Sequence, residues 1–555
     1  MMKSLKKALS LLLALALTVS LSACSQSSGS GSSGSTAAST AASSGPSAAA
    51  GTQASAEKPT AAAEQKANKK DTLVIAAPQI PKAMIPFNPE QFIGQDDALL
   101  PVNIFETPFR LNPDGTISPW IATEYSWSDD GKDLTLTIRD DVHFSNGDPM
   151  TVDDVVWSID TTANSRYGRQ NFTCFDSIEK VDDTHCVIHM TDYYPAILKI
   201  LAQRMASIMS QKYYEEVGLE GYLEKPLGTG PYLMGDWDPK DHLVFEINEN
   251  YWNKEHMPFY KQITLKQLND ANTQMLALEN GEIDVLLYAP ISPLLKLPEN
   301  SGISYSIAPA GTVLKMFFNA NSGGIASDVR FRQAIAHAVN RDEINIGVYE
   351  GQANIAEAGV GSFFGGFPDA GTYTRPLEFD PEKAKELLKE LNYNGEEFVI
   401  TVQSGKKDEL SAQIIQGQLM NIGINCTIKA LDSASYSALT KLETGWDARV
   451  HSNTYSAIDL GQMTSFTYRY HQESSPNTYY ASPINEEYEK LVWDSLKVST
   501  EEERKEIFAK AISIQNEQVI EFGMIEDFSV CAYHDYVEGV VSCPMQAVFY
   551  LNDWH

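Results

Sequence analysis

Residues 104–115 read IFETPFRLNPDG and open a run of strand and turn signals that continues to about residue 150. The letters NPDG at 112–115 are typical of a tight turn, because proline presets one backbone angle and glycine tolerates the left-handed one. After a second turn signal, residues 134–138 alternate between apolar and polar, as in a half-buried strand. At 151–159 the spacing becomes helical, with Thr151 as a capping residue and an aspartate three positions on. This stretch predicts strands joined by turns and followed by a helix.

Strands and helices are also predicted outside this stretch. Residues 71–76 and 314–318 are short apolar runs typical of buried strands. Helical spacing predicts helices over the ranges 329–339, 381–391, 410–420 and 501–518. Strands and helices mix without regular alternation and no internal repeat is visible, which favours a multi-domain α/β protein.

The composition limits the class of protein. The hydrophobic content of 43% and aromatic content of 10% exclude general disorder. A net charge of −31 argues against binding of nucleic acid or direct adhesion to anionic lipid, and it is sufficiently explained by solubility. The part from about residue 71 to residue 555 is long enough for two or three domains.

The N-terminus carries a targeting signal. Lys3, Lys6 and Lys7 precede an apolar run of residues 8–19, which is too short to span a bilayer. The run ends in Leu-Ser-Ala before Cys24, and this resembles a bacterial lipoprotein signal in which the cysteine is acylated and becomes the mature N-terminus. We therefore expect residues 1–23 to be removed and Cys24 to carry the lipid.

The segment that follows Cys24 is almost wholly Ser, Ala, Gly and Thr. It has too little apolar surface to offset its ordering entropy, so we expect residues 24–70 to form a flexible tether. Its root-mean-square reach is roughly 35 to 40 Å. The expected location is the cell membrane, lipid-anchored on its extracellular face, or the periplasmic face if the source has an outer membrane.

Motifs for catalysis and metal binding are absent from the sequence. There is no Gly-x-Ser-x-Gly, Walker A or His-Glu-x-x-His motif, so we expect no enzyme and no cofactor. His185 and His189 lie about 13 Å apart on a predicted strand, too far for one metal ion. The spacings of Cys174 with Cys186 and of Cys531 with Cys543 allow a disulfide in each case, with buried free thiols as the default.

Several short and distinct sequence blocks follow one another along the chain. They are 104–115, SPWIA at 118–122, 138–151 with 153–155, LGTGPY at 227–232, NYW at 250–252, GEID at 281–284, DVRFRQAIAHAVNR at 328–341, DPEKAK at 380–385 and QLMNIGI at 418–424. Together they resemble the signature of the family 5 extracellular solute-binding proteins, the oligopeptide and dipeptide receptors of ABC importers. Each block also has a structural role of its own, and we expect these motifs mainly to hold the fold.

The resemblance implies a two-lobed periplasmic-binding-protein-like α/β fold with an extra subdomain inserted in the first lobe. Lobe I would comprise residues 71–108, 229–314 and 522–555. The inserted subdomain would be 109–228 and lobe II would be 315–521. The hinge is expected at 314–319, with closure around a solute that contacts both lobes.

The resemblance also implies a ligand site. Peptide receptors of this family bind the ammonium group with an aspartate, and the corresponding stretch here ends at Asp459, with Ala457 and Ile458 in place of the usual Asp-Pro. A capping or surface role explains Asp459 equally well. Lys406, or its neighbour Lys407, is a candidate for the peptide carboxylate, although exposed lysines before a helix are equally ordinary. Phe87 and Tyr455 are candidate aromatic contacts, with core packing as the alternative.

We therefore expect a monomeric, lipid-anchored receptor that delivers peptides to an ABC permease. The alternatives are a receptor for another solute on the same scaffold, such as a nickel chelate, a sugar or an opine-like compound, and a peptide-sensing lipoprotein not coupled to transport.

Overall fold

The computed structural model describes residues 70–81, 99, 101–113, 115–165, 168–320, 323–405, 407–439, 446–454, 460, 485–498, 500–541 and 549–555. All of them belong to one compact unit, Pro59–His555. No helix within these ranges is both long and apolar enough to cross a membrane.

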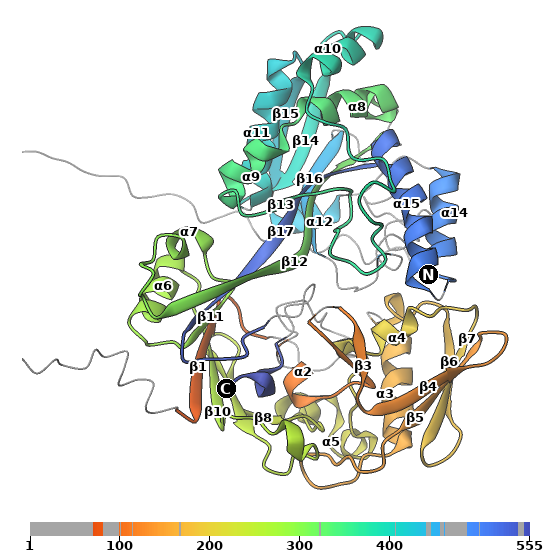
Figure 1. Ribbon diagram of the computed structural model, residues 1–555, viewed down its shortest axis with the longest axis vertical. Helices are drawn as coiled ribbons and strands as arrows, with labels where there is room; N and C mark the ends of the chain where they lie inside the picture. Colours follow the sequence, from red (N-terminus) through yellow and green to blue (C-terminus); the bar gives the residue numbers. More distant parts are fainter. Residues whose placement is uncertain are drawn as a thin grey trace, which may run out of the picture. The chain divides into compact units, whose positions relative to one another are not determined.

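Eleven strands among the described residues form one large mixed sheet (Figure 1). The first strand group is β8 (Tyr232–Asp238), β9 (His242–Ile247), β10 (Gln262–Gln267), β1 (Thr72–Ala77) and β11 (Val285–Leu287). The second strand group is β15 (Asn425–Leu431), β14 (Glu397–Gln403) and β16 (Ala448–Thr454). Two long antiparallel strands, β12 (Ile303–Phe318) and β17 (Glu521–His534), join the two groups, and the short β13 (Asn354–Ile355) pairs with β17.

Each strand group contains a parallel core. β1 lies parallel between β10 and β11, and β14 lies parallel between β15 and β16. Parallel strands are buried on both faces and therefore have nearly continuous apolar sequences. This explains the run in β1, whose Leu73, Ile75 and Ala76 are buried, and it confirms the strand predicted at 71–76.

Two smaller sheets lie between β1 and β8 in the sequence. A hairpin of β2 (Phe109–Leu111) and β3 (Ile117–Pro119) encloses the predicted turn, where Gly115 has a φ of 81°. The other sheet has the order β4 (Ala122–Trp127), β5 (Asp133–Ile138), β7 (His185–Met190) and β6 (Phe175–Lys180). In β5 every second residue is buried, as its alternating sequence predicts.

The capping signal at Thr151 is also confirmed. α3 (Val152–Asn164) begins with a capping box, in which the Thr151 N–H donates to Asp154 Oδ2 at 2.9 Å and the Asp154 N–H donates back to the Thr151 hydroxyl. This reciprocal pair of hydrogen bonds satisfies two backbone N–H donors that would otherwise lack a partner at the start of the helix.

The remaining helices follow the predicted spacing closely. α8 (Val329–Ala338), α10 (Pro381–Glu390) and α15 (Glu501–Gln518) match three predicted ranges, and α11 (Lys407–Asn421) begins three residues before its predicted start. The others are α2 (Pro101–Ile104), α4 (Ile197–Ile200), α5 (Gln211–Glu224), α6 (Ala271–Glu279), α7 (Ile291–Leu294), α9 (Arg341–Tyr349), α12 (Ser433–Ala438) and α14 (Glu486–Ser495).

β12 is buried on both faces in its second half. Leu314, Met316 and Phe318 face one hydrophobic cluster, together with residues of α8 and α11. Lys315 lies on the opposite face with no exposed side-chain surface, and its Nζ is 2.7 Å from Glu521 Oε2, which is 1% exposed. The Lys315 ammonium also donates to the Gly359 carbonyl at 2.9 Å. A fully buried ion pair thus connects β12 with the start of β17.

Candidate functional site

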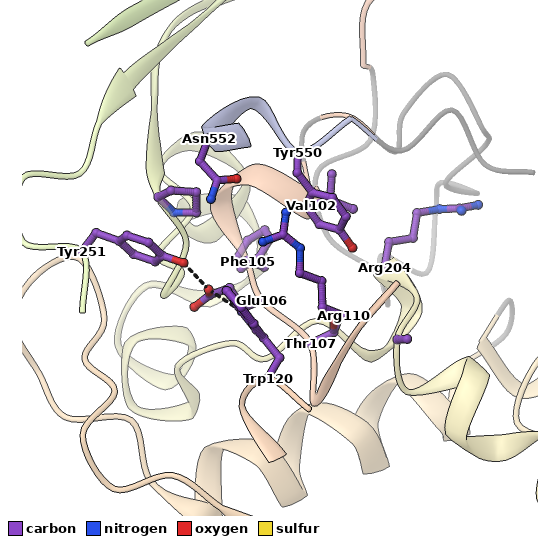
Figure 2. Close-up of a pocket in the computed structure, with 12 residues that line it drawn as sticks. Val102, Phe105, Glu106, Thr107, Arg110, Trp120, Arg204, Tyr251, Tyr550 and Asn552 are labelled. Carbon is purple, nitrogen blue, oxygen red and sulfur yellow. Dashed lines mark hydrogen bonds between the residues drawn. The ribbon is translucent and has the colours of Figure 1, made fainter. Parts of the chain in front are cut away.

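Four of the sequence blocks meet at the carboxylate of Glu106, which is 6% exposed. The Trp120 Nε1–H and the Tyr251 hydroxyl donate to Oε1 at 2.7 and 2.8 Å, and the Trp252 Nε1–H donates to Oε2 at 2.6 Å. Burial raises the pKa of Glu106, while these three hydrogen bonds oppose the shift. Figure 2 shows the carboxylate between Tyr251 and Trp120.

The fourth block, LGTGPY, approaches the same region through its backbone. A Cβ on Gly228 would lie 2.0 Å from the Ile104 carbonyl oxygen, so only glycine fits there. The Gly230 N–H donates to that same carbonyl at 2.9 Å. Glycine is therefore needed in this block so that the loop can pack directly on α2.

The pocket beside Glu106 is small. It has a volume of about 30 Å³, which is the share of a single water molecule in the liquid. Arg110 fills its side, with the guanidinium 4.0 Å from the Tyr550 ring centre and 2.5 Å from Asp553. This cluster holds the fold together and has no room for a solute.

Replacing Glu106 by glutamine is expected to lower the free energy of unfolding by about 1–3 kcal/mol. The amide keeps one acceptor oxygen but turns an NH₂ group toward donors that need an acceptor. Urea denaturation measures the change. Glu124→Gln, an exposed position on β4, is the matched control and is expected to stay within about 0.5 kcal/mol of the unsubstituted protein; equal stability of the two variants would contradict the role given to Glu106.

A larger cavity lies beside β12 and β17. Its volume is about 520 Å³, within the range of small-molecule sites. It is lined from five segments: 288–292, 309–310 with Thr312, 348–350, Lys407 and 527–530. Residues next to both strand groups therefore face one space.

The position of this cavity follows from the sheet topology. Tyr288 comes directly after β11, and Lys407 begins the helix that follows β14. Both strands are members of parallel sets, and ligands of open α/β sheets bind outside the carboxyl ends of such strands. The cavity is thus where the topology predicts a ligand.

Charged and aromatic side chains meet in the cavity wall. Lys407 Nζ lies 3.2 and 3.3 Å from the two carboxylate oxygens of Asp527, and it lies 4.6 Å from the Tyr349 ring centre. The side chain of Lys407 is 50% exposed and that of Asp527 only 15%. Burial raises the pKa of Asp527, and the Lys407 ammonium opposes this shift.

The carboxylate of Asp408, the residue after Lys407, already has polar partners. It accepts hydrogen bonds from the N–H and hydroxyl of Ser452 on β16, and its Oδ2 is 3.5 Å from His451 Nδ1. Burial would raise the pKa of Asp408, but the nearby His451 ring and the hydrogen bonds from Ser452 outweigh it and the pKa is lowered. The Ser452 hydroxyl donates to the aspartate and not to the histidine, which differs from a hydrolytic triad.

The backbone is unusual at two places in the cavity wall. Tyr288 has a φ of 56° and Glu350 a φ of 55°, both in the left-handed region that favours glycine. Glu350 caps the end of α9, where this conformation is common. Tyr288 lies in the turn directly after β11, and non-glycine residues with this conformation also cluster at ligand sites.

All the predicted functional residues lie outside the described residues. They are Cys24, Phe87, Lys406, Tyr455 and Asp459. Lys407, the alternative to Lys406, lies in the cavity wall. Asp527 was not predicted from the sequence. The sequence feature that could have indicated it is the pair of adjacent carboxylates, Glu526 and Asp527, which interrupts an apolar strand.

The two histidines of β7 have acidic neighbours. His185 Nδ1 is 2.9 Å from Asp182, and His189 Nδ1 is 2.7 Å from Asp133. The described part of the chain contains no cluster of three or more residues suited to a metal ion. Cys186 is a free thiol, so the alternative bridge to Cys174 is not formed, whereas Cys543 lies outside the described residues.

Comparisons with known proteins show which family the chain resembles. A family model described as bacterial extracellular solute-binding proteins, family 5, matches residues 116–480. The nickel-binding periplasmic protein of Escherichia coli K12 is 26% identical over 376 residues, 63% of this chain and 69% of that protein. A glutathione-binding protein of Salmonella paratyphi A is 26% identical over 371 residues, 62% of this chain and 69% of the relative.

Among solved structures, an ABC transporter-associated periplasmic binding protein of Helicobacter pylori in complex with the peptide STSA has a TM-score of 0.72 at 22% identity. The alignment covers 89% of this chain and 99% of that one. This likeness, together with the mixed sheet, confirms the predicted two-lobed α/β fold.

Proposed function

Because the chain belongs to the bacterial extracellular solute-binding proteins of family 5, we propose that it captures a solute between its lobes and delivers it to the permease of an ABC importer. The lobe boundaries are part of this proposal: lobe I at 71–108, 229–314 and 522–555, the inserted subdomain at 109–228, and lobe II at 315–521. All strands of the first strand group fall within the residues assigned to lobe I, and all strands of the second fall within lobe II, which supports these boundaries.

The observation that carries the proposal is the cavity of about 520 Å³ between segments of both proposed lobes. A solute held there contacts both sides and stabilises the closed arrangement over the open one. β12 and β17 are the connections about which such closure would occur. A permease could then distinguish loaded from empty receptor.

The proposed solute is a peptide. The glutathione-binding relative and the structural neighbour in complex with STSA support this choice, and the volume is in the range that small-molecule ligands occupy. The nickel-binding relative makes a nickel chelate the competing outcome. Native mass spectrometry of the purified protein would identify a co-purified solute and separate the two.

Closure without chemistry is the first test. A bound solute is expected to lower the radius of gyration in small-angle scattering and to be recovered unchanged after hours of incubation. A solute that is cleaved by protease-free protein would contradict a receptor. Uptake of labelled solute that depends on the permease would separate transport from sensing.

If Asp459 receives the peptide ammonium, as the family resemblance implies, replacing it by asparagine is expected to weaken peptide affinity at least about a hundredfold, because a buried ammonium would lose its anionic partner. Calorimetry measures the change. Asp342→Asn, an exposed position in the first turn of α9, is the matched control and is expected to leave the affinity unchanged.

N-acetylated peptides should show a comparable loss with the unsubstituted protein, since they carry no ammonium group. Equal affinity for free and acetylated peptides would reject an ammonium site at Asp459. Failure to bind a peptide library, with binding of nickel-histidine, would favour the chelate.

A further inference from the structure

The ammonium group of Lys407 lies in a surrounding built for a cation. Its Nζ lies 4.6 Å from the Tyr349 ring centre and 5.8 Å from that of Phe528, and it pairs with both oxygens of Asp527. Two aromatic faces and one carboxylate are the groups that bind ammonium ions in proteins. We name Tyr349, Phe528 and Asp527 the cation seat.

The seat is more deeply buried than the lysine that occupies it. Tyr349 is 1% exposed, and the Asp527 side chain is 15% exposed. Lys407 is half exposed on a flexible four-carbon stem, so its head group can move into solvent at low cost. All four residues line the cavity of about 520 Å³, so a solute in that cavity reaches the seat.

The neighbouring carboxylates of Asp408 and Glu350 do not take the place of Asp527 in this seat. Asp408 follows Lys407 directly, but its carboxylate already accepts two hydrogen bonds from Ser452, and its Oδ2 lies 3.5 Å from His451 Nδ1. Glu350 also lines the cavity and is exposed. Asp527 is therefore the carboxylate in the described wall that pairs with the Lys407 ammonium.

We propose that the cation seat, as the alternative to Asp459, binds the ammonium group of the transported solute, and that Lys407 occupies it as a built-in competitor when no solute is bound. This inference rests on the proposed function. It gives the solute class as compounds with an ammonium group, either a primary amine such as a peptide terminus or a quaternary amine.

A lysine that competes for the seat and a lysine that binds a carboxylate respond oppositely to removal. If Lys407 bound the carboxylate of the solute, its removal would weaken binding. If Lys407 competes with an ammonium for the seat, its removal strengthens binding, because the seat becomes free and a like charge has been removed from the site. The sign of one measured change therefore separates the two roles.

The test uses calorimetry with tetra-alanine and with glycine betaine on the full-length protein. Lys407→Gln is expected to bind the accepted probe about five- to tenfold tighter, since a half-exposed ion pair and a cation–π contact no longer compete. Asp527→Asn and Phe528→Leu are expected to weaken binding, the first by at least about tenfold. A tetra-alanine response assigns a primary amine and a betaine response a quaternary one.

Lys385→Gln is the matched control, because it removes an exposed lysine paired with Glu382 on α10. Thermal unfolding confirms that each variant is folded. Weaker or unchanged binding in Lys407→Gln would overturn the inference and leave the proposed function standing, and so would a loss of tetra-alanine affinity in Asp459→Asn that Asp527→Asn does not share. If neither probe binds any variant, the inference is overturned, and binding of nickel-histidine then decides whether the proposed function survives.

Discussion

Replacing Lys315 by methionine is expected to lower the free energy of unfolding by about 3–5 kcal/mol. The substitution leaves the Glu521 carboxylate buried without its cation, and the Gly359 carbonyl loses a donor. Both strands that join the two strand groups are affected, because Lys315 is on β12 and Glu521 on β17. Urea denaturation, followed by circular dichroism, measures the change.

Two controls separate burial from charge. Lys407→Gln removes the same charge from a half-exposed ion pair and is expected to cost less than about 1 kcal/mol. The double variant Lys315→Met with Glu521→Leu is expected to recover most of the loss, because no charge remains buried. A single Lys315 variant no less stable than Lys407→Gln would show that the ion pair contributes little.

Replacing Cys24 by alanine is expected to abolish membrane association. The variant has no thiol that could be acylated at the signal junction. Stable anchoring needs the acyl chains, because each methylene group buried in the membrane contributes about 0.8 kcal/mol. Phase partitioning in Triton X-114 should place the unsubstituted protein in the detergent phase and the variant in the aqueous phase or the medium.

Cys426→Ala is the control, because Cys426 is a buried thiol on β15 with no place in the signal. It should remain in the detergent phase. Identical partitioning of the Cys24 variant and the unsubstituted protein would exclude the lipid anchor. Protease added to intact cells should also cleave the unsubstituted protein, since the location expected from the sequence is the extracellular face of the membrane.

Local features were predictable from the sequence, because they depend on neighbours in the chain. The capping box at Thr151, the alternation in β5 and the start of α8 after Asp328 all arise within a few residues. The order of the blocks was enough to indicate the family. Long strands were less predictable: the apolar run at 314–318 marks only the end of β12, which begins at Ile303.

The sequence by itself thus determined the family, the fold class and the elements whose hydrogen bonds are local. Only the tertiary structure decided which distant side chains meet. Lys407 and Asp527 are 120 positions apart, and Glu106 and Trp252 are 146 apart. Such pairs depend on strand order and register, which place side chains on one face by long-range pairing. No local pattern encodes that pairing, so the 520 Å³ cavity and its charges became visible only in the folded chain.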